Sequence, residues 1–175
     1  HGGDGWAAAA RVHDDSGDGQ LRRGLAPTGV TRALACTDQP FPYNDLPRRG
    51  ARLQQNPDIG VICMEPQRGT PPRAGFLEGV RDLATRYGAV LIFDECTSGF
   101  RRPLGGLHLD LRVEPDIATF GKTLGNGYAI TAVIGRGEVL QAAQRTFISS
   151  TSWTERIGPT AARAAIERMG TGGDP

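Results

Sequence analysis

The chain has 175 residues, a formal net charge of +1 and a hydrophobic content of 38%. This length and composition suffice for one α/β domain with a packed core, and no apolar run approaches the ~20 residues that a membrane span requires. The near-neutral charge, with arginines scattered among acids, argues against a nucleic-acid-binding surface. Three widely spaced cysteines, Cys36, Cys63 and Cys96, favour a reduced, cytoplasmic protein over a disulfide scaffold.

Regular patterning is weak over residues 1–58 and sharp after them. The early part contains a polar, glycine-rich stretch from His13 to Pro27 and a turn signal at Asn44 and Asp45, so loops are predicted there. Ile59 to Met64 is then a nearly continuous apolar run, which is typical of a buried strand in a parallel sheet.

A helix and a second strand follow this run. Between Phe76 and Tyr87 the apolar residues recur on one helical face, and Gly88 is well placed to end the helix. Ala89 to Phe93 is predicted to be another buried strand, directly followed by Asp94. A strand–helix–strand unit implies a parallel pair with a right-handed crossover. Asp94 is therefore expected at the carboxyl edge of the sheet, where ligands bind in open α/β folds.

Two more short strands are predicted, Ile117 to Phe120 and Ala129 to Gly135, with Lys122 in the glycine-rich turn between them. Glu138 to Arg145 is predicted to be a short helix. Pro159 to Met169 is predicted to be another, because proline suits the first helical position and the alanines that follow favour helix.

Lys122 is the only lysine among the 20 basic residues of the sequence. A guanidinium stays protonated at ordinary pH, whereas an amine can lose its proton and attack a carbonyl. An amine and a carboxylate at one sheet edge, here Lys122 and Asp94, are what a pyridoxal phosphate (PLP) site requires. The lysine forms a Schiff base with the aldehyde, and the aspartate keeps the pyridine nitrogen protonated. Spacing alone leaves an alternative open, in which Asp94 caps a turn and Lys122 is a solvated loop residue.

Other ligand motifs are excluded by single residues. Asp116 stands where a phosphate-binding P-loop needs its first glycine, and Ile130 stands where a dinucleotide fingerprint needs its third. The histidines have no metal-ligand spacing with one another or with cysteine, so no metal site is predicted.

The stretch LIFDECTSGFR at residues 91–101, followed by PDIATFGK at residues 115–122, resembles the signature of the class III (subgroup II) PLP-dependent aminotransferases. The likeness is closer to the glutamate-1-semialdehyde 2,1-aminomutase-like branch, which shares the Phe-Asp-Glu and Gly-Phe-Arg patterns and a Pro-Asp ahead of Gly-Lys. The resemblance implies an α/β fold with three layers and a mostly parallel sheet, as in the large domain of the fold-type I PLP enzymes.

The resemblance also implies roles for individual residues. Lys122 corresponds to the catalytic Schiff-base lysine and Asp94 to the partner of the pyridine nitrogen. Cys96 falls where the family usually has a valine packed on the cofactor ring, and a thiol can pack there too. Thr97 falls where many members have glutamine or methionine near the phenolic oxygen of the cofactor. Thr154 matches a threonine that reaches the cofactor phosphate of the neighbouring subunit.

The assignment of Thr154 has alternatives. Its place just before a predicted helix suits an anion, but ordinary turn or cap duty is equally compatible with it. Thr151 is a second candidate for the same role. The family usually has a Gly-Asn-Pro sequence here, whereas this chain has Arg-Ile-Gly-Pro at residues 156–159.

Residues 1–175 are interpreted as part of a PLP-binding large domain. The resemblance places the phosphate cup before His1 and a small C-terminal domain after Pro175. The implied activity is amino-group transfer between a small-molecule donor and a keto acid or aldehyde, by a protein that is a homodimer when full length. Two alternatives stay open: an aminomutase that moves the amino group within one molecule, and a truncated fragment without catalysis.

Overall fold

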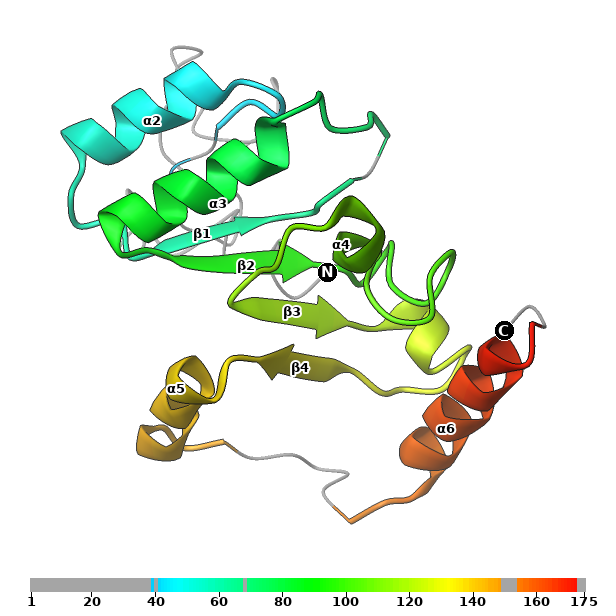
Figure 1. Cartoon of the computed structure of the whole chain (residues 1–175). Coiled ribbons are helices and arrows are strands. Elements are labelled where there is room, and N and C mark those ends of the chain that lie inside the picture. Colours follow the sequence, from blue (N-terminus) through cyan, green and yellow to red (C-terminus); the bar gives the residue numbers. More distant parts are fainter. Residues whose placement is uncertain (1–38, 40, 68, 149–153, 173–175) are drawn as a thin grey trace, which may run out of the picture. The chain divides into compact units, whose positions relative to one another are not determined.

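The computed structural model describes residues 39, 41–67, 69–148 and 154–172 (Figure 1). The stretch from His13 to Pro27, Cys36 and Thr151 lie outside the described residues. The chain divides into two compact units, residues 1–48 and 49–175, and the sheet lies wholly in the second.

A four-stranded sheet forms the centre of the second unit, in the order β1-β2-β3-β4 (Figure 1). Its strands are β1 (Val61–Met64), β2 (Val90–Asp94), β3 (Ile117–Phe120) and β4 (Ala132–Gly135). The first three are parallel, and β4 is antiparallel to β3. The predicted strands and the mostly parallel sheet are therefore confirmed, although β1 and β4 are shorter than the sequence suggested.

Helix α3 (Phe76–Tyr87) joins β1 to β2 and has the bounds that its periodicity predicted. Gly88 ends it in the left-handed region, with φ of 68°, and its N–H caps carbonyls of the last turn. Leu77, Val80 and Ala84 of α3 are buried, as its apolar stripe implies.

The core lies against one face of the sheet. Alternation along β1, β2 and β3 buries every second residue, and these buried side chains are Ile62, Met64, Leu91, Phe93, Ala118 and Phe120. Residues of the other parity are more exposed, with Val61 at 51% and Val133 at 59%. Asp94 and Thr119 are in register and both belong to this second set, so they share the more open face.

Helix α2 (Leu46–Gln55) lies where no helix was predicted. Arg48 donates its backbone N–H to Asp45 Oδ1 at 3.1 Å, so the predicted turn residue Asp45 caps the helix. Arg49 is buried, donates to the sulfur of Met64 at 3.4 Å, and lies 5.2 Å from the centre of the Phe76 ring. Apolar periodicity does not predict α2, because Arg49 packs against the core at a position where an apolar residue is expected.

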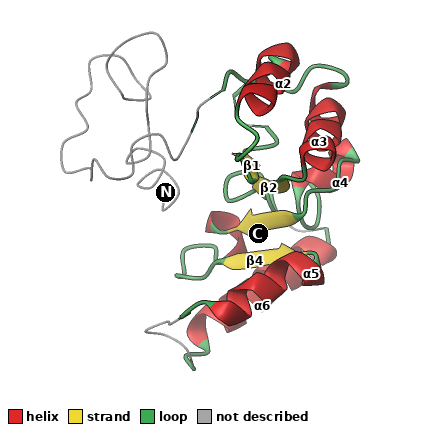
Figure 2. Cartoon of the chain, turned by 90° about the vertical axis from the view of Figure 1, so that its left-hand side faces the viewer, coloured by secondary structure: helices red, strands yellow, loops and turns green. Residues whose placement is uncertain are grey.

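The remaining helices and 3₁₀ turns come after β2, β3 and β4 in the sequence. Figure 2 shows α3 beside β1 and β2, and it shows α5 (Gly137–Leu140) and α6 (Ile157–Gly170) on the β4 side. Two short elements were not predicted: α4 (Leu107–Leu111) and the 3₁₀ turn η2 (Lys122–Leu124). The predicted helix at 138–145 is split into α5 (Gly137–Leu140) and the 3₁₀ turn η3 (Gln141–Arg145). Among the described helices, none is long and apolar enough to cross a membrane.

Helix α6 (Ile157–Gly170) begins before the predicted Pro159, which occupies its first turn, where a missing N–H is tolerated. Ala162 of α6 joins Ala118, Phe120 and Leu124 in one buried cluster. This cluster fixes the segment that follows β3, and so supports the turn that carries Lys122.

Candidate active site

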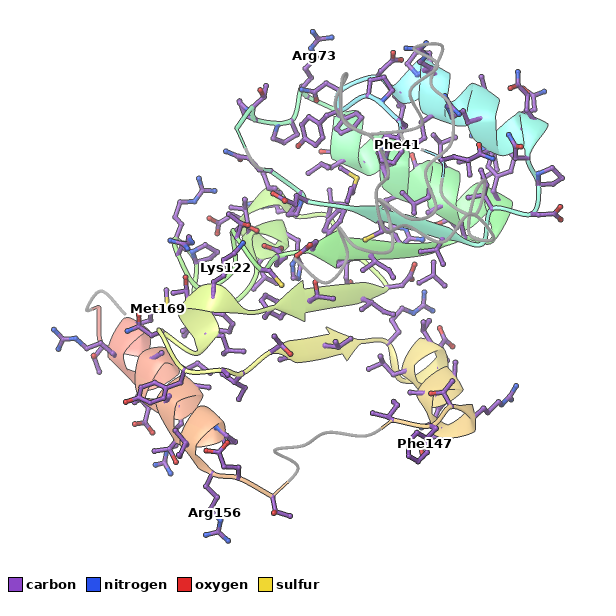
Figure 3. All side chains as sticks on the ribbon, turned by 180° about the vertical axis from the view of Figure 1, so that it is seen from behind. Phe41, Arg73, Lys122, Phe147, Arg156 and Met169 are labelled. Carbon is purple, nitrogen blue, oxygen red and sulfur yellow. The ribbon has the colours of Figure 1, made fainter. Side chains whose placement is uncertain are left out.

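Two parallel strands deliver the main candidates to the same sheet edge. Asp94 is the last residue of β2, and Lys122 lies just beyond the end of β3 (Figure 3). Since β2 and β3 are hydrogen-bonded neighbours, their carboxyl ends lie side by side. The structure thus brings together the amine and the carboxylate that the sequence singled out.

The backbone at Lys122 is unusual for a residue with a side chain. Its φ is 46°, in the left-handed region that non-glycine residues seldom adopt. Such strain persists only where the surroundings impose it, and it concentrates at functional sites. The preceding Gly121 packs closely: a Cβ there would stand 3.4 Å from Cys96 Sγ. The turn therefore holds Lys122 against the residues that follow β2.

The Asp94 carboxylate is oriented through one of its oxygens. Oδ1 accepts the backbone N–H of Cys96 at 3.0 Å and the hydroxyl of Thr119 at 3.4 Å. Within the described part of the chain, no hydrogen bond reaches Oδ2. One oxygen thus fixes the group, and the other is available to a ligand. Thr119 was missed by the sequence analysis, although strand parity puts it on the same face as Asp94.

The amine of Lys122 has a defined partner. Its Nζ donates a hydrogen bond to Thr97 Oγ1 at 2.6 Å. Lys122 is exposed and Thr97 is half-buried, and the two residues come from the segments after β3 and β2 respectively. Figure 3 shows Lys122 at this end of the sheet. Thr97, singled out for its place in the signature, therefore lies in direct contact with the lysine.

Cys96 lies between the two strand ends. Its sulfur is 3.9 Å from Thr119 Oγ1. Burial raises the pKa of the Cys96 thiol above its ordinary value of 9.0, and the neighbouring Asp94 carboxylate raises it further, against smaller opposing effects of Thr119 and Lys122. The thiol is therefore neutral near pH 7 and can pack as a small apolar group.

Glu95 stabilises the loop after β2, which carries Cys96 and Thr97, through several hydrogen bonds. Its carboxylate is fully buried and accepts the hydroxyl of Ser98 at 2.6 Å, His108 Nδ1 at 2.7 Å, and the backbone N–H groups of Leu107 and His108 at 2.8 and 2.9 Å. A buried carboxylate with this many donors is satisfied and holds both ends of the loop together. This role could not be predicted from the sequence, because the partners lie up to 13 residues away.

Among the proposed residues that the structure describes, Thr154 is the one that lies away from this cluster. It is exposed and precedes α6, and no hydrogen bond within the described residues joins it to Lys122 or Asp94. Its assignment to a cofactor phosphate stays a prediction.

A model of the family described as "Aminotransferase class-III" matches residues 48–171. The chain belongs to this family. Over 135 residues it is 43% identical to a 3-aminobutyryl-CoA aminotransferase of Cloacimonas acidaminovorans (strain Evry). That match covers 73% of this chain and 33% of the relative, so the chain spans about a third of the length of that protein.

Several solved structures share the fold. An omega-transaminase from Sphaerobacter thermophilus is 27% identical with a TM-score of 0.74, and the match covers 81% of this chain and 35% of that one. A glutamate-1-semialdehyde aminomutase from Pseudomonas aeruginosa PAO1, in complex with PMP, is 25% identical with a TM-score of 0.65, covering 83% and 35%. The PLP internal aldimine form of FumI from Sphingopyxis sp. MTA144 has the same fold at 22% identity, with a TM-score of 0.75, covering 93% and 42%.

The family identifies pyridoxal phosphate as the cofactor, and the residues at the sheet edge fit it. The cofactor offers an aldehyde to an amine and a ring nitrogen to a carboxylate. Lys122 is an amine on a constrained backbone, and Asp94 presents an oxygen that no described residue occupies. Because transaminases and an aminomutase both appear among the similar structures, family membership establishes the class and leaves the branch open.

Proposed function

We propose that the protein catalyses PLP-dependent transfer of an amino group between a small-molecule donor and a keto acid or aldehyde. Lys122 is the residue that binds the cofactor covalently, and Asp94 is the partner of its ring nitrogen. The observation that carries this proposal is the placement of Lys122, the only lysine of a class-III chain, at the sheet edge beside Asp94.

The bound cofactor supplies an electron sink for the carbon that bears the amino group. Lys122 Nζ then holds and moves a proton, first as a general base and then as a general acid, which an arginine could not do at neutral pH. Asp94 Oδ2 would accept the hydrogen bond of the ring N–H, while Oδ1 is held by the Cys96 N–H and the Thr119 hydroxyl. The neutral Cys96 thiol would pack beside the ring without adding a second negative charge.

Two forms of the reaction are considered: amino transfer between two molecules, and an aminomutase reaction within one molecule. The glutamate-1-semialdehyde aminomutase-like branch is supported by the Gly-Phe-Arg sequence at 99–101 and by the likeness to the Pseudomonas structure. Intermolecular transfer is supported by the 43% identity to an enzyme named as a 3-aminobutyryl-CoA aminotransferase. We favour intermolecular transfer. A labelled donor nitrogen that appears on a separate keto acceptor supports it, whereas nitrogen retained within one molecule supports the aminomutase.

The assembly we propose is a homodimer of the full-length protein, in a reduced compartment such as the cytoplasm. Thr154 then contributes to the phosphate site of the neighbouring subunit. A Thr154→Ala variant of the full-length protein is expected to bind the cofactor more weakly without losing its dimeric mass in sedimentation. Unchanged cofactor affinity contradicts the role given to Thr154.

Covalent capture tests the central proposal directly. The chain is incubated with pyridoxal phosphate, reduced with borohydride, digested and mapped by mass spectrometry, and the expected adduct lies on the peptide that contains Lys122. Lys122→Ala and Lys122→Arg should both lose it, because a guanidinium does not form this bond at neutral pH. Arg86→Ala, at an exposed position in α3, is the control and should retain it.

The possible results separate the alternatives. Capture at Lys122 without amino transfer in the 175-residue chain, combined with activity of the full-length protein, identifies this stretch as an incomplete pocket. Capture only at the N-terminal amine, or equal capture in Lys122→Ala, refutes the assignment of Lys122.

A further inference from the structure

We propose that Thr97 is a positioning residue for Lys122: its hydroxyl holds the amine at the sheet edge before any cofactor is bound. The inference rests on the proposed function of Lys122 as the reactive amine. It adds a specific role to a residue whose place in the signature implied only a contact with the cofactor.

The contact between the two residues is short and joins separate segments. Lys122 Nζ and Thr97 Oγ1 are 2.6 Å apart, and the two residues are separated by 25 positions in the sequence. A lysine side chain has four rotatable carbon–carbon bonds and, at an exposed position, samples many rotamers. A short hydrogen bond to a fixed acceptor selects the few rotamers that keep the amine at the edge.

Thr97 is well suited to be the fixed member of the pair. Its side chain is branched at Cβ and therefore stiff at χ1. Its backbone oxygen accepts Arg101 Nε at 2.6 Å, which ties the residue to the next turn of the loop. The flexible amine is thus held by a rigid hydroxyl.

The rest of the loop is equally constrained. Gly99 donates its N–H to the backbone oxygen of Glu95 at 2.7 Å, and Ser98 donates its hydroxyl to the buried Glu95 carboxylate at 2.6 Å. These bonds flank Thr97 on its C-terminal side, while Asp94 accepts the Cys96 N–H on the other. The hydroxyl therefore occupies its place independently of Lys122, as preorganisation requires.

The neutrality of Thr97 matters for the chemistry. A carboxylate in its place would favour the charged form of the amine, which cannot attack an aldehyde. A hydroxyl orients the amine without adding a negative charge. Because the hydroxyl holds the amine by a single hydrogen bond, the amine can leave it when a covalent bond with a cofactor forms.

The single lysine makes the proposal directly measurable. In protein labelled with ¹³C,¹⁵N-lysine, all lysine side-chain signals arise from Lys122. In the wild-type chain without cofactor, we expect two separate Hε shifts and slow Cε reorientation, as for a held side chain. In Thr97→Val the shifts should merge and Cε should become as mobile as in a free lysine, whereas Thr97→Ser should restore the held state.

A matched control and a kinetic readout complete the test. Thr85→Val, the same substitution at an exposed position of α3, should leave the Lys122 signals unchanged. The rate of covalent capture by pyridoxal phosphate should fall about fivefold in Thr97→Val, as expected for the loss of one hydrogen bond. Thr97→Ser should recover most of it.

The outcomes bear separately on the two proposals. A freely mobile Lys122 Cε in the wild-type chain overturns the positioning role, even if Thr97→Val fails to fold. Equal mobility in the wild-type and Thr97→Val chains, or a Thr97→Ser chain that behaves like Thr97→Val, overturns it as well. Absence of capture at Lys122 in every variant, with the held signals intact, refutes the proposed function and leaves only the contact between Thr97 and the Lys122 amine.

Discussion

Substitution of Asp116 tests how the part of the sheet that carries the candidate active site is stabilised. Asp116 precedes β3 at its amino end, the edge opposite to Lys122. Its buried Oδ2 accepts the backbone N–H of Leu91 and the guanidinium of Arg81, both at 2.8 Å, and Oδ1 accepts Arg136 at 3.0 Å. One side chain thus links β2, β3, α3 and the end of β4.

The cost of each substitution follows from these partners. In Asp116→Ala the buried N–H of Leu91 loses its acceptor, which costs about 1–3 kcal/mol, and the charged bond to Arg81 is lost, which costs about 1.5–3 kcal/mol. We therefore expect Asp116→Ala to lower the free energy of unfolding by about 3–5 kcal/mol. In Asp116→Asn the amide oxygen can still serve Leu91 and Arg81, so the expected loss is about 1–2 kcal/mol. Arg136 is 57% exposed, and Arg136→Ala should cost less than about 1 kcal/mol.

Urea unfolding followed by circular dichroism measures these differences, with an unchanged m-value showing that the unfolded state is comparable. The expected order of stability is wild type, Arg136→Ala, Asp116→Asn and then Asp116→Ala. If Asp116→Asn is as destabilised as Asp116→Ala, or if both lie within about 0.5 kcal/mol of the wild type, the linking role of Asp116 is wrong.

The pH dependence gives an independent check. Burial opposes ionisation of Asp116, but the N–H of Leu91 and the guanidinium groups of Arg81 and Arg136 outweigh it and hold the pKa of this carboxyl below its ordinary value of 3.8. A pKa lower in the folded state means that the stabilisation is complete above about pH 5 and is lost as the pH falls through the folded pKa. The stability gap between wild type and Asp116→Asn should therefore be constant from about pH 5 to 7 and should narrow below about pH 4.

Two further substitutions or modifications follow from the loop after β2. Gly99→Ala places a Cβ 2.9 Å from the Glu95 carbonyl oxygen and against the Phe120 ring, so we expect it to lower the free energy of unfolding in urea by about 1–3 kcal/mol. The control Gly60→Ala, whose Cβ has no atom within 4 Å, should leave that free energy unchanged. Equal effects of the two substitutions contradict the tight packing at Gly99. Because the pKa of the Cys96 thiol is raised, iodoacetamide should label Cys96 more slowly at about pH 8 than it labels the exposed Cys63. Mass spectrometry of each peptide measures the two labelling rates. Faster labelling of Cys96 than of Cys63 contradicts a neutral, packed thiol.

The sequence predicted those parts of the fold that local periodicity determines. Helix α3 has the predicted bounds because its apolar stripe and its terminal glycine are both local signals. Helix α2 was missed because Arg49 takes a core position, which apolar periodicity cannot show. The antiparallel direction of β4 was not predicted, since a short apolar run has the same appearance in either direction.

The same distinction between local sequence signals and non-local contacts applies to the candidate site. Asp94 and Lys122 could be predicted because strand ends and a long ordered signature are visible in the sequence. Glu95 and Asp116 could not, because what defines their roles is burial together with partners that mostly lie 12 to 35 residues away. The contact between Thr97 and Lys122 likewise depends on how two loops approach each other, although each residue had been singled out separately.

The absence of an ion pair between the two candidate groups is itself consistent with the proposed chemistry. Asp94 and Lys122 lie at neighbouring strand ends, yet among the described residues the lysine donates to the neutral Thr97 and the aspartate accepts from an amide and a hydroxyl. A direct ion pair would favour the charged amine and would occupy the carboxylate oxygen that the ring nitrogen needs. At the opposite edge, Asp116 is matched with two arginines. Opposite charges are thus paired at the edge that Asp116 stabilises, and they are not paired at the edge where the proposed reaction needs a free amine and a free carboxylate oxygen.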